Sequence, residues 1–184
     1  MSWMLTASGR KVHPAALRAA DVDIGDIAHH LGMLCRFTGA CRRFYSVAEH
    51  SLLVADILAE SDPRDHELQL VGLLHDAPEA YLADLATPLK AQLPEYREFE
   101  RGAWLSIAAA LGLSYTMPPQ VKHADLVALA IERRELMPAH PDEWPAFQGL
   151  QVPAGAQGLP SARCIGYRPE IAAHAFLVRY RALA

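Results

Sequence analysis

Apolar residues recur at intervals of three and four along most of the chain, a spacing that is typical of amphipathic helices. After Asp23, which can cap a helix, this pattern predicts a first helix over residues 24–35. Ser46 precedes Glu49 as in a capping box and predicts that a second helix begins there. The Ser-Asp-Pro run at 61–63 ends that helix and offers the N-cap and the first position of a third.

Prolines divide the rest of the chain into further elements. Pro78 cannot lie inside an unbroken helix, because it lacks a backbone N–H and its ring presses on the preceding turn. The chain is therefore predicted to break at residues 75–78, and Thr87-Pro88 predicts a turn after the break. Three more helices are predicted to begin near Pro94, Pro118-Pro119 and Pro169.

The overall pattern predicts an all-α protein, a compact bundle of about six helices. No stretch alternates apolar and polar residues over a useful strand length, and the chain contains no repeat. The Pro- and Gly-rich segment 137–166 is predicted to be a long packed loop anchored by Trp144 and Phe147. With 184 residues, of which 52% are hydrophobic, a single domain over 1–184 can bury a core of its own.

Charge and composition narrow the classes of function. A formal net charge of -4 argues against binding to a nucleic acid polymer, because such surfaces cluster Lys and Arg. No apolar run approaches the ~20 residues that span a bilayer, and the first residues do not resemble a signal peptide. We therefore expect no membrane association and a cytoplasmic location. Cys35, Cys41 and Cys164 form no C-x-x-C pair and are predicted to be reduced packing residues.

Four residues suggest a metal site. His75 and Asp76 are adjacent at the predicted helix break, where both side chains can turn toward one cation. His50 lies one turn into the second helix, and Asp125 is the lone carboxylate in the apolar first half of a later helix. Taken singly, each residue also has a purely structural explanation, such as a histidine that hydrogen-bonds to a neighbour or a carboxylate that interacts with a helix N-terminus. Together they form a set of two histidines and two carboxylates that suits zinc, cobalt, manganese or iron.

The order of these motifs resembles that of HD-domain phosphohydrolases, and most closely that of the bacterial 5'-deoxynucleotidases. An HD pair alone is a weak signal, whereas several pieces in the same order are specific. The resemblance covers most of the chain and rests on Arg36-Phe37, Tyr45 to Ser51, Leu73 to Glu79, Asp84 to Lys90, and Lys122 to Asp125.

The resemblance implies that one divalent metal ion is bound by His50, His75, Asp76 and Asp125. It also implies that Glu79 orients or deprotonates the attacking water and that Arg36 grips phosphate, with Asp84 as a further catalytic residue. The substrate side would be lined by Arg36, Phe37, Asp84, Thr87 and Lys90. The family's deoxynucleotidases have Trp where this chain has Phe37, and a small polar residue where it has Pro78, so sugar and base preference stay open.

The reaction expected from the resemblance is removal of phosphate from deoxyribonucleoside 5'-monophosphates by a water that the metal activates. Compact, phage-type HD proteins share these motifs and strip triphosphate from deoxynucleotides such as dATP, so a triphosphohydrolase is the alternative. Extra basic groups near the site would favour the triphosphohydrolase, and the sequence offers Arg42, Arg43, Arg97 and Arg101. A non-catalytic, metal-dependent nucleotide sensor is a third possibility, and the family implies a homo-oligomer, a dimer or larger.

Other candidates are interpreted as structural. His123 lies two residues before Asp125, about 200° round a helix from it, and is expected to point elsewhere. Of His29 and His30, one is placed near enough to approach the site. The large apolar residues Trp104, Trp144 and Met137 are expected to belong to the core.

Overall fold

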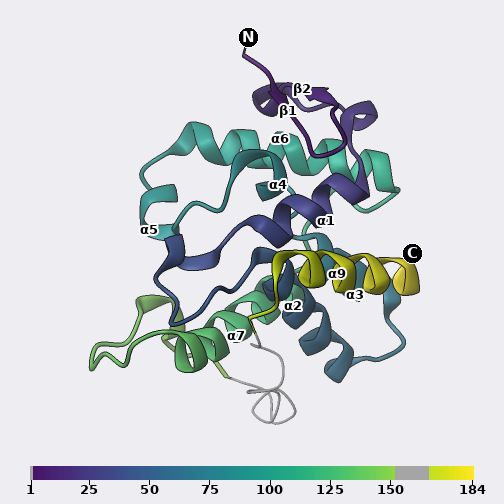
Figure 1. Ribbon diagram of the computed structural model, residues 1–184. Helices are drawn as coiled ribbons and strands as arrows, with labels where there is room; N and C mark the ends of the chain where they lie inside the picture. The colour runs from purple at the N-terminus through teal and green to yellow at the C-terminus, as the bar shows by residue number, and fades with distance from the viewer. Residues whose placement is uncertain (1, 152–165) are drawn as a thin grey trace.

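The computed structural model describes residues 2–151 and 166–184, and helices dominate this part of the chain (Figure 1), which confirms the predicted all-α class. The α-helices are α1 (Ile24–Met33), α2 (Val47–Ser61), α3 (His66–Leu74), α4 (Glu79–Leu82), α5 (Thr87–Lys90), α6 (Pro94–Leu111), α7 (Pro119–Leu136) and α9 (Pro169–Leu183). Short 3-10 turns occur at η1 (Pro14–Ala16), η2 (Ala19–Asp21), η3 (Arg36–Gly39) and η4 (Pro145–Phe147).

Local signals set most helix ends. The Asp23 carboxylate accepts hydrogen bonds from the amides of the first turn of α1, and Ser46 and Glu49 form the predicted capping box of α2. The chain breaks after α3 at residues 75–78, as Pro78 predicts. Helix α6 ends at Gly112, whose φ of 70° is a left-handed conformation that glycine adopts without steric cost. The predicted proline starts are confirmed at Pro94, Pro119 and Pro169.

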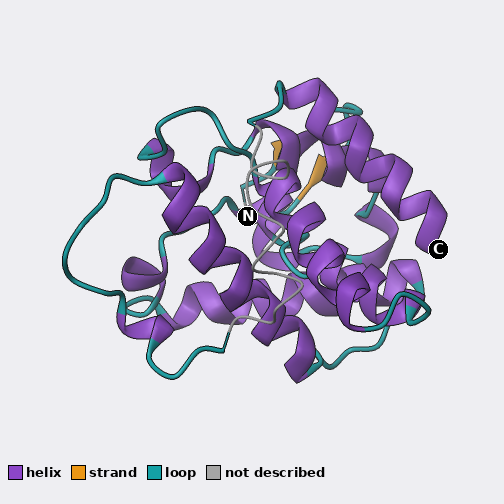
Figure 2. Cartoon of the chain, turned by 90° about the horizontal axis from the view of Figure 1, so that it is seen from below, coloured by secondary structure: helices purple, strands orange, loops and turns teal. Residues whose placement is uncertain are grey.

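Three local predictions were wrong. The third helix begins at His66 and not at Pro63, because the Asp65 carboxylate caps it by accepting from the Leu68 amide at 2.9 Å. A small antiparallel pair, β1 (Met4–Leu5) with β2 (Lys11–Val12), was missed because strands of two residues carry no alternation (Figure 2). The predicted turn at Thr87-Pro88 is the first turn of α5. Of the predicted loop 137–166, residues 152–165 and with them Cys164 lie outside the described residues.

Helix α2 lies at the centre of the fold, where it packs against α1, α3, α7 and α9 (Figure 1). Its first three turns are buried almost throughout, including the polar residues Glu49, His50 and Ser51. Helices α1 and α9 approach closely at Gly32, where a Cβ atom would lie 2.7 Å from the carbonyl oxygen of Pro169. In the part of the chain that is described, no helix combines the length and the apolar character needed to cross a membrane.

Candidate metal centre and its pocket

Three separate elements bring the four predicted metal ligands together. His50 comes from the first turns of α2, His75 and Asp76 from the break between α3 and α4, and Asp125 from the second turn of α7. The two imidazole Nε2 atoms lie 3.3 Å apart. Asp125 Oδ1 lies 3.1 Å from Nε2 of His50 and 3.9 Å from that of His75. Asp76 Oδ2 lies 3.5 Å and 3.2 Å from the same two atoms.

These separations fit a single cation. Donor atoms placed about 2.1 Å from one ion at tetrahedral or octahedral angles are separated by about 3.0–3.4 Å. The donors of His50, His75 and Asp76 all lie within 4.8 Å of one another, and Asp125 closes the more exposed side, with 41% of its side chain accessible. Nitrogen and carboxylate donors in this combination suit first-row divalent ions.

The second nitrogen of each imidazole is already engaged. His75 Nδ1 lies 2.8 Å from the carbonyl oxygen of Gly72, and His50 Nδ1 lies 2.7 Å from Glu132 Oε1. Because these oxygens only accept, each Nδ1 must donate its proton, and in the neutral ring the lone pair is then on Nε2. Both lone pairs thus face the common centre, as in metal-ligating histidines with an outer hydrogen-bond partner.

Glu132 was not identified from the sequence. It is fully buried on α7, and its two oxygens accept from His50 and, at 3.1 Å, from Arg36. The available signal was its position seven residues after Asp125, which places both carboxylates on one face of the helix. Glu132 therefore connects a predicted metal ligand to the predicted phosphate-binding arginine.

Arg36 is buried at the start of η3, where its guanidinium lies 3.1 Å from Glu132 and 3.7 Å from Asp76. Its Nε has no hydrogen-bond partner among the described residues. The next two residues, Phe37 and Thr38, have left-handed backbones with φ of 55° and 53°. Such conformations cost energy for residues with a side chain, and they are concentrated at functional sites. This bend leaves the ring of Phe37 5.2 Å from the guanidinium of Arg36.

Glu79 begins α4 and is only 4% exposed. Its Oε1 lies 3.5 Å from Lys90 Nζ, while its buried Oε2 has no hydrogen-bond partner in the described chain. Burial, together with the charges of Asp76 and Asp84, raises the pKa of Glu79 well above its usual range, although Lys90 opposes the shift. The site therefore contains a buried carboxyl group, one oxygen of which is enclosed without a hydrogen-bond partner among the described residues.

The electrostatics of the centre favour a bound cation. Burial and Arg36 lower the pKa of His50, but Glu132 and Asp125 raise it by more, so that the pKa reaches about 10 when no metal is present. Burial raises the pKa of Asp76, but His75, His50 and Arg36 outweigh it and keep this pKa below the ordinary range. In the absence of metal, protons on the imidazoles balance the carboxylates.

The centre opens into a pocket of about 610 Å³. All of the predicted substrate residues line it, namely Arg36, Phe37, Asp84, Thr87 and Lys90. Lys90 does not pair with Asp84, the simple interpretation that the sequence allowed, but lies 2.6 Å from Glu100 on α6. Burial raises the pKa of Asp84, against the effect of Arg36.

Two predictions about large apolar residues were wrong. Trp144 and Met137 were expected in the core, yet both line the pocket, together with Leu129 and Pro145. The sequence could not show this, because the segment that carries Trp144 folds back over α7 only in the tertiary structure. Trp104, in contrast, is buried in the core as expected.

The other histidines lie apart from the centre. His123 is exposed, as predicted from its position on the helix. His30 is the nearer of the pair in α1 to α4, but its ring is hydrogen-bonded to the backbone, with Nδ1 2.7 Å from the carbonyl oxygen of Ala80 and Nε2 accepting from the Ala7 amide. His30 therefore supports the packing of α4 against α1.

Comparison with known proteins places the chain among relatives that are themselves uncharacterized. No family model matches it. It is 37% identical over 150 residues to the uncharacterized protein YfdR of Escherichia coli K12, which covers 82% of this chain and 81% of that protein. An uncharacterized protein of Rhodobacter capsulatus is 33% identical over an alignment of 190 residues, which covers 99% of this chain and 95% of the other. The chain therefore belongs to the same family as YfdR.

Proposed function

We propose that this protein is a metal-dependent phosphohydrolase that removes phosphate from deoxyribonucleoside 5'-monophosphates. One observation carries the proposal: the Nε2 atoms of two imidazoles lie 3.3 Å apart, each lies within 4 Å of a carboxylate oxygen of Asp76 and of Asp125, and both Nδ1 atoms are engaged elsewhere. The site adjoins a pocket that also holds a buried carboxyl group and a buried guanidinium. This combination suits hydrolysis of a phosphate ester.

A divalent ion, of cobalt, manganese, zinc or iron, would supply a Lewis acid that polarises a phosphoryl oxygen and lowers the pKa of water. Glu79, which lines the pocket, is placed to orient or deprotonate the attacking water. The guanidinium of Arg36, which also lines the pocket, binds the phosphate oxygens and offsets the charge that develops on them. Lys90, 3.5 Å from Glu79, keeps its positive charge because Glu100 and Glu79 raise its pKa against the effect of burial, and it is placed to bind a second phosphate oxygen.

Charge in the pocket favours a monophosphate over a triphosphate. Among the described residues, the arginine and lysine side chains that line the pocket are Arg36 and Lys90, against the carboxyl groups of Asp76, Glu79, Asp84 and Asp125. The four arginines that a triphosphate could use, Arg42, Arg43, Arg97 and Arg101, do not line it. A triphosphate would bring about four negative charges to a pocket with little cationic surface to receive them.

Product analysis tests the proposal. Metal-loaded protein is incubated with each deoxynucleoside mono- and triphosphate, with ribonucleotides as controls, and the products are separated by anion-exchange chromatography. We expect orthophosphate from the monophosphates. Release of intact triphosphate from a triphosphate would establish the alternative reaction, and no turnover with any of the four metals would leave a nucleotide sensor, for which Glu79→Ala would leave ligand binding unchanged.

A further inference from the structure

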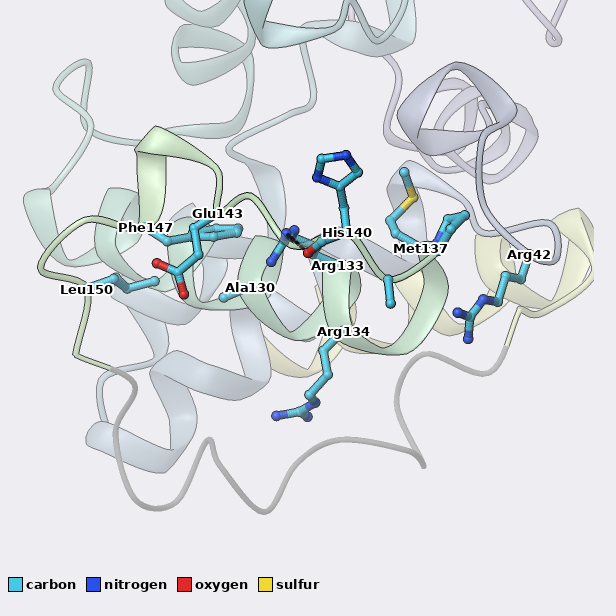
Figure 3. A pocket seen from close by; sticks show the side chains of 11 residues that line it. Arg42, Ala130, Arg133, Arg134, Met137, His140, Glu143, Phe147 and Leu150 are labelled. Atoms are coloured by element: carbon cyan, nitrogen blue, oxygen red, sulfur yellow. Dashed lines mark hydrogen bonds between the residues drawn. The ribbon is translucent and has the colours of Figure 1, made fainter.

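A second pocket, of about 460 Å³, borders the first and shares Met137 with it. It lies over the C-terminal half of α7 and is covered by the segment 138–150 (Figure 3). Among the described residues that line it, three are arginines, Arg42, Arg133 and Arg134, and one is acidic, Glu143. A pocket with this excess of cationic groups contrasts with the net charge of -4 of the whole chain.

The arginine side chains of this pocket differ in the contacts that they already make within the protein. Arg133 is engaged: it donates to the carbonyl oxygen of Asp142 at 2.7 Å and lies against the rings of Trp144 and Phe147. Among the described residues, Arg134 pairs with its half-buried sequence neighbour Glu135, and a salt bridge near the surface contributes little. The Arg42 guanidinium makes no ion pair with any described residue, while its backbone amide donates to the carbonyl oxygen of Leu136 at 2.9 Å. Two exposed guanidinium groups are thus available to an anion.

The acidic residue and Arg42 lie on different sides of the pocket, so that the two sides differ in charge. Figure 3 shows Arg42 on the Met137 side and Glu143 with Phe147 and Leu150 on the other side. Guanidinium groups bind phosphate through paired N–H donors, and a volume of this size accommodates a small phosphorylated molecule. The Arg42 side is therefore the side that would receive a phosphate group.

The two pockets are physically connected. Trp144 lines the metal pocket and Phe147 lines the second one, and their rings stack with centroids 5.7 Å apart and planes at 19°. Arg133 contacts both rings, at 5.5 Å and 5.9 Å from their centroids. A ligand that held the segment 138–150 against α7 would also hold Trp144 at the wall of the metal pocket.

We propose that the second pocket binds a small phosphate-bearing anion through the exposed arginines that line it, Arg42 and Arg134, and that this ligand fixes the Trp144 wall of the neighbouring metal pocket. The site is distinct from the metal centre, and its existence does not depend on the reaction proposed above. Its role is to couple the availability of a phosphorylated compound to the shape of the metal pocket.

Hydrogen exchange measured by mass spectrometry tests this coupling, with inorganic phosphate as the probe and chloride at equal ionic strength as the control. A chelator keeps metal out, so that no turnover enters the measurement. We expect phosphate to slow exchange in the peptide that spans residues 138–150. The double substitution R42A/R134A should weaken the response, measured as the phosphate concentration for half effect, at least about tenfold.

Two variants test whether the protection by phosphate arises in the second pocket. Arg42 and Arg134 are exposed, so R42A/R134A is expected to fold, which circular dichroism verifies. Glu143→Gln, in the same pocket, should keep the full response, because it removes a negative charge, that of the one acidic group among the described lining residues. Equal protection in R42A/R134A and wild type would place the phosphate at the metal pocket and overturn the proposal, as would the absence of any protection specific to phosphate.

Discussion

At the scale of single residues, the carboxyl groups of Glu79 and Glu132 are both buried beside the metal centre but differ in their partners. Glu132 has two strong donors, so that Arg36 and His50 lower its pKa against the effect of burial. Glu79 has Lys90 at 3.5 Å and an unpartnered oxygen, and burial with the charges of Asp76 and Asp84 raises its pKa. The first is suited to hold other groups in place, whereas the second is suited to exchange a proton.

Glu79→Gln should separate activity from stability. A raised pKa means that the folded protein binds this proton more tightly than the unfolded chain. The stabilisation from it is complete below the unfolded pKa, about 4.3, and is lost as the pH rises through the folded value. We therefore expect the Gln variant to lose turnover by about 100-fold or more, yet to match wild type in thermal stability near pH 4 and to exceed it near pH 8. A variant less stable than wild type at pH 8 would contradict this account.

Glu132→Gln should weaken metal binding without unfolding the protein. The amide keeps the shape of the side chain but removes the charge that orients the proton of His50 Nδ1 and balances Arg36. Loss of such an outer partner lowers metal affinity by about 10–100-fold. Calorimetric titration with the metal measures this loss, and Glu135→Gln on the same helix serves as the matched control. Equal affinities in the two variants would assign Glu132 a purely structural role.

At the scale of secondary-structure elements, the site depends on how closely helices approach one another. Helix α9 closes the bundle over α1 and α2, and its approach to α1 is set at Gly32, where no Cβ fits beside Pro169. The break between α3 and α4 matters equally, since it lets two adjacent residues, His75 and Asp76, present donors to one point. An uninterrupted helix would turn consecutive side chains about 100° apart.

Gly32→Ala should therefore destabilise the fold, and Gly102→Ala should not. The added methyl group at Gly32 would lie 2.7 Å from a backbone oxygen, whereas at Gly102, in α6, nothing lies within 4 Å. We expect a loss of about 1–3 kcal/mol in the free energy of unfolding for the first variant and a gain of about 0.5–1 kcal/mol for the second, because alanine favours a helix over glycine. Urea denaturation of the two variants measures both. A gain at both positions would show that α1 and α9 can separate without cost.

At the scale of the whole molecule, the metal centre joins three parts of the chain that are distant in sequence. The proposed ligands come from helix α2, the α3–α4 break and α7, so a bound ion would cross-link the centre of the bundle. Ligand binding to the folded state alone raises its stability. Without metal, the pKa of His50 is about 10 and that of His75 is raised, so that protons compete with the ion for the imidazole nitrogens.

Metal removal should lower the melting temperature, and metal affinity should rise with pH. Because the pKa of His50 is about 10 without metal, binding at neutral pH must displace its proton. Affinity should change by about tenfold per pH unit for each proton displaced. Calorimetric titrations at pH 6 and pH 8 measure the affinity, and repeating them in buffers of different ionisation enthalpy measures the number of protons released. Thermal melts with and without a chelator measure the change in melting temperature. Affinity independent of pH would mean that the ion binds elsewhere.

The sequence by itself determined the helical class, because the three- and four-residue spacing, the caps at Asp23 and Ser46 and the prolines act within a few residues of one another. It also singled out the side chains that the fold brings together, since a motif retains its order whatever its three-dimensional setting. Only the tertiary structure decided that Glu132 joins His50 to Arg36 and that Trp144 lines a pocket. These contacts link residues distant in the chain, and their energies depend on burial and distance, which no local pattern records.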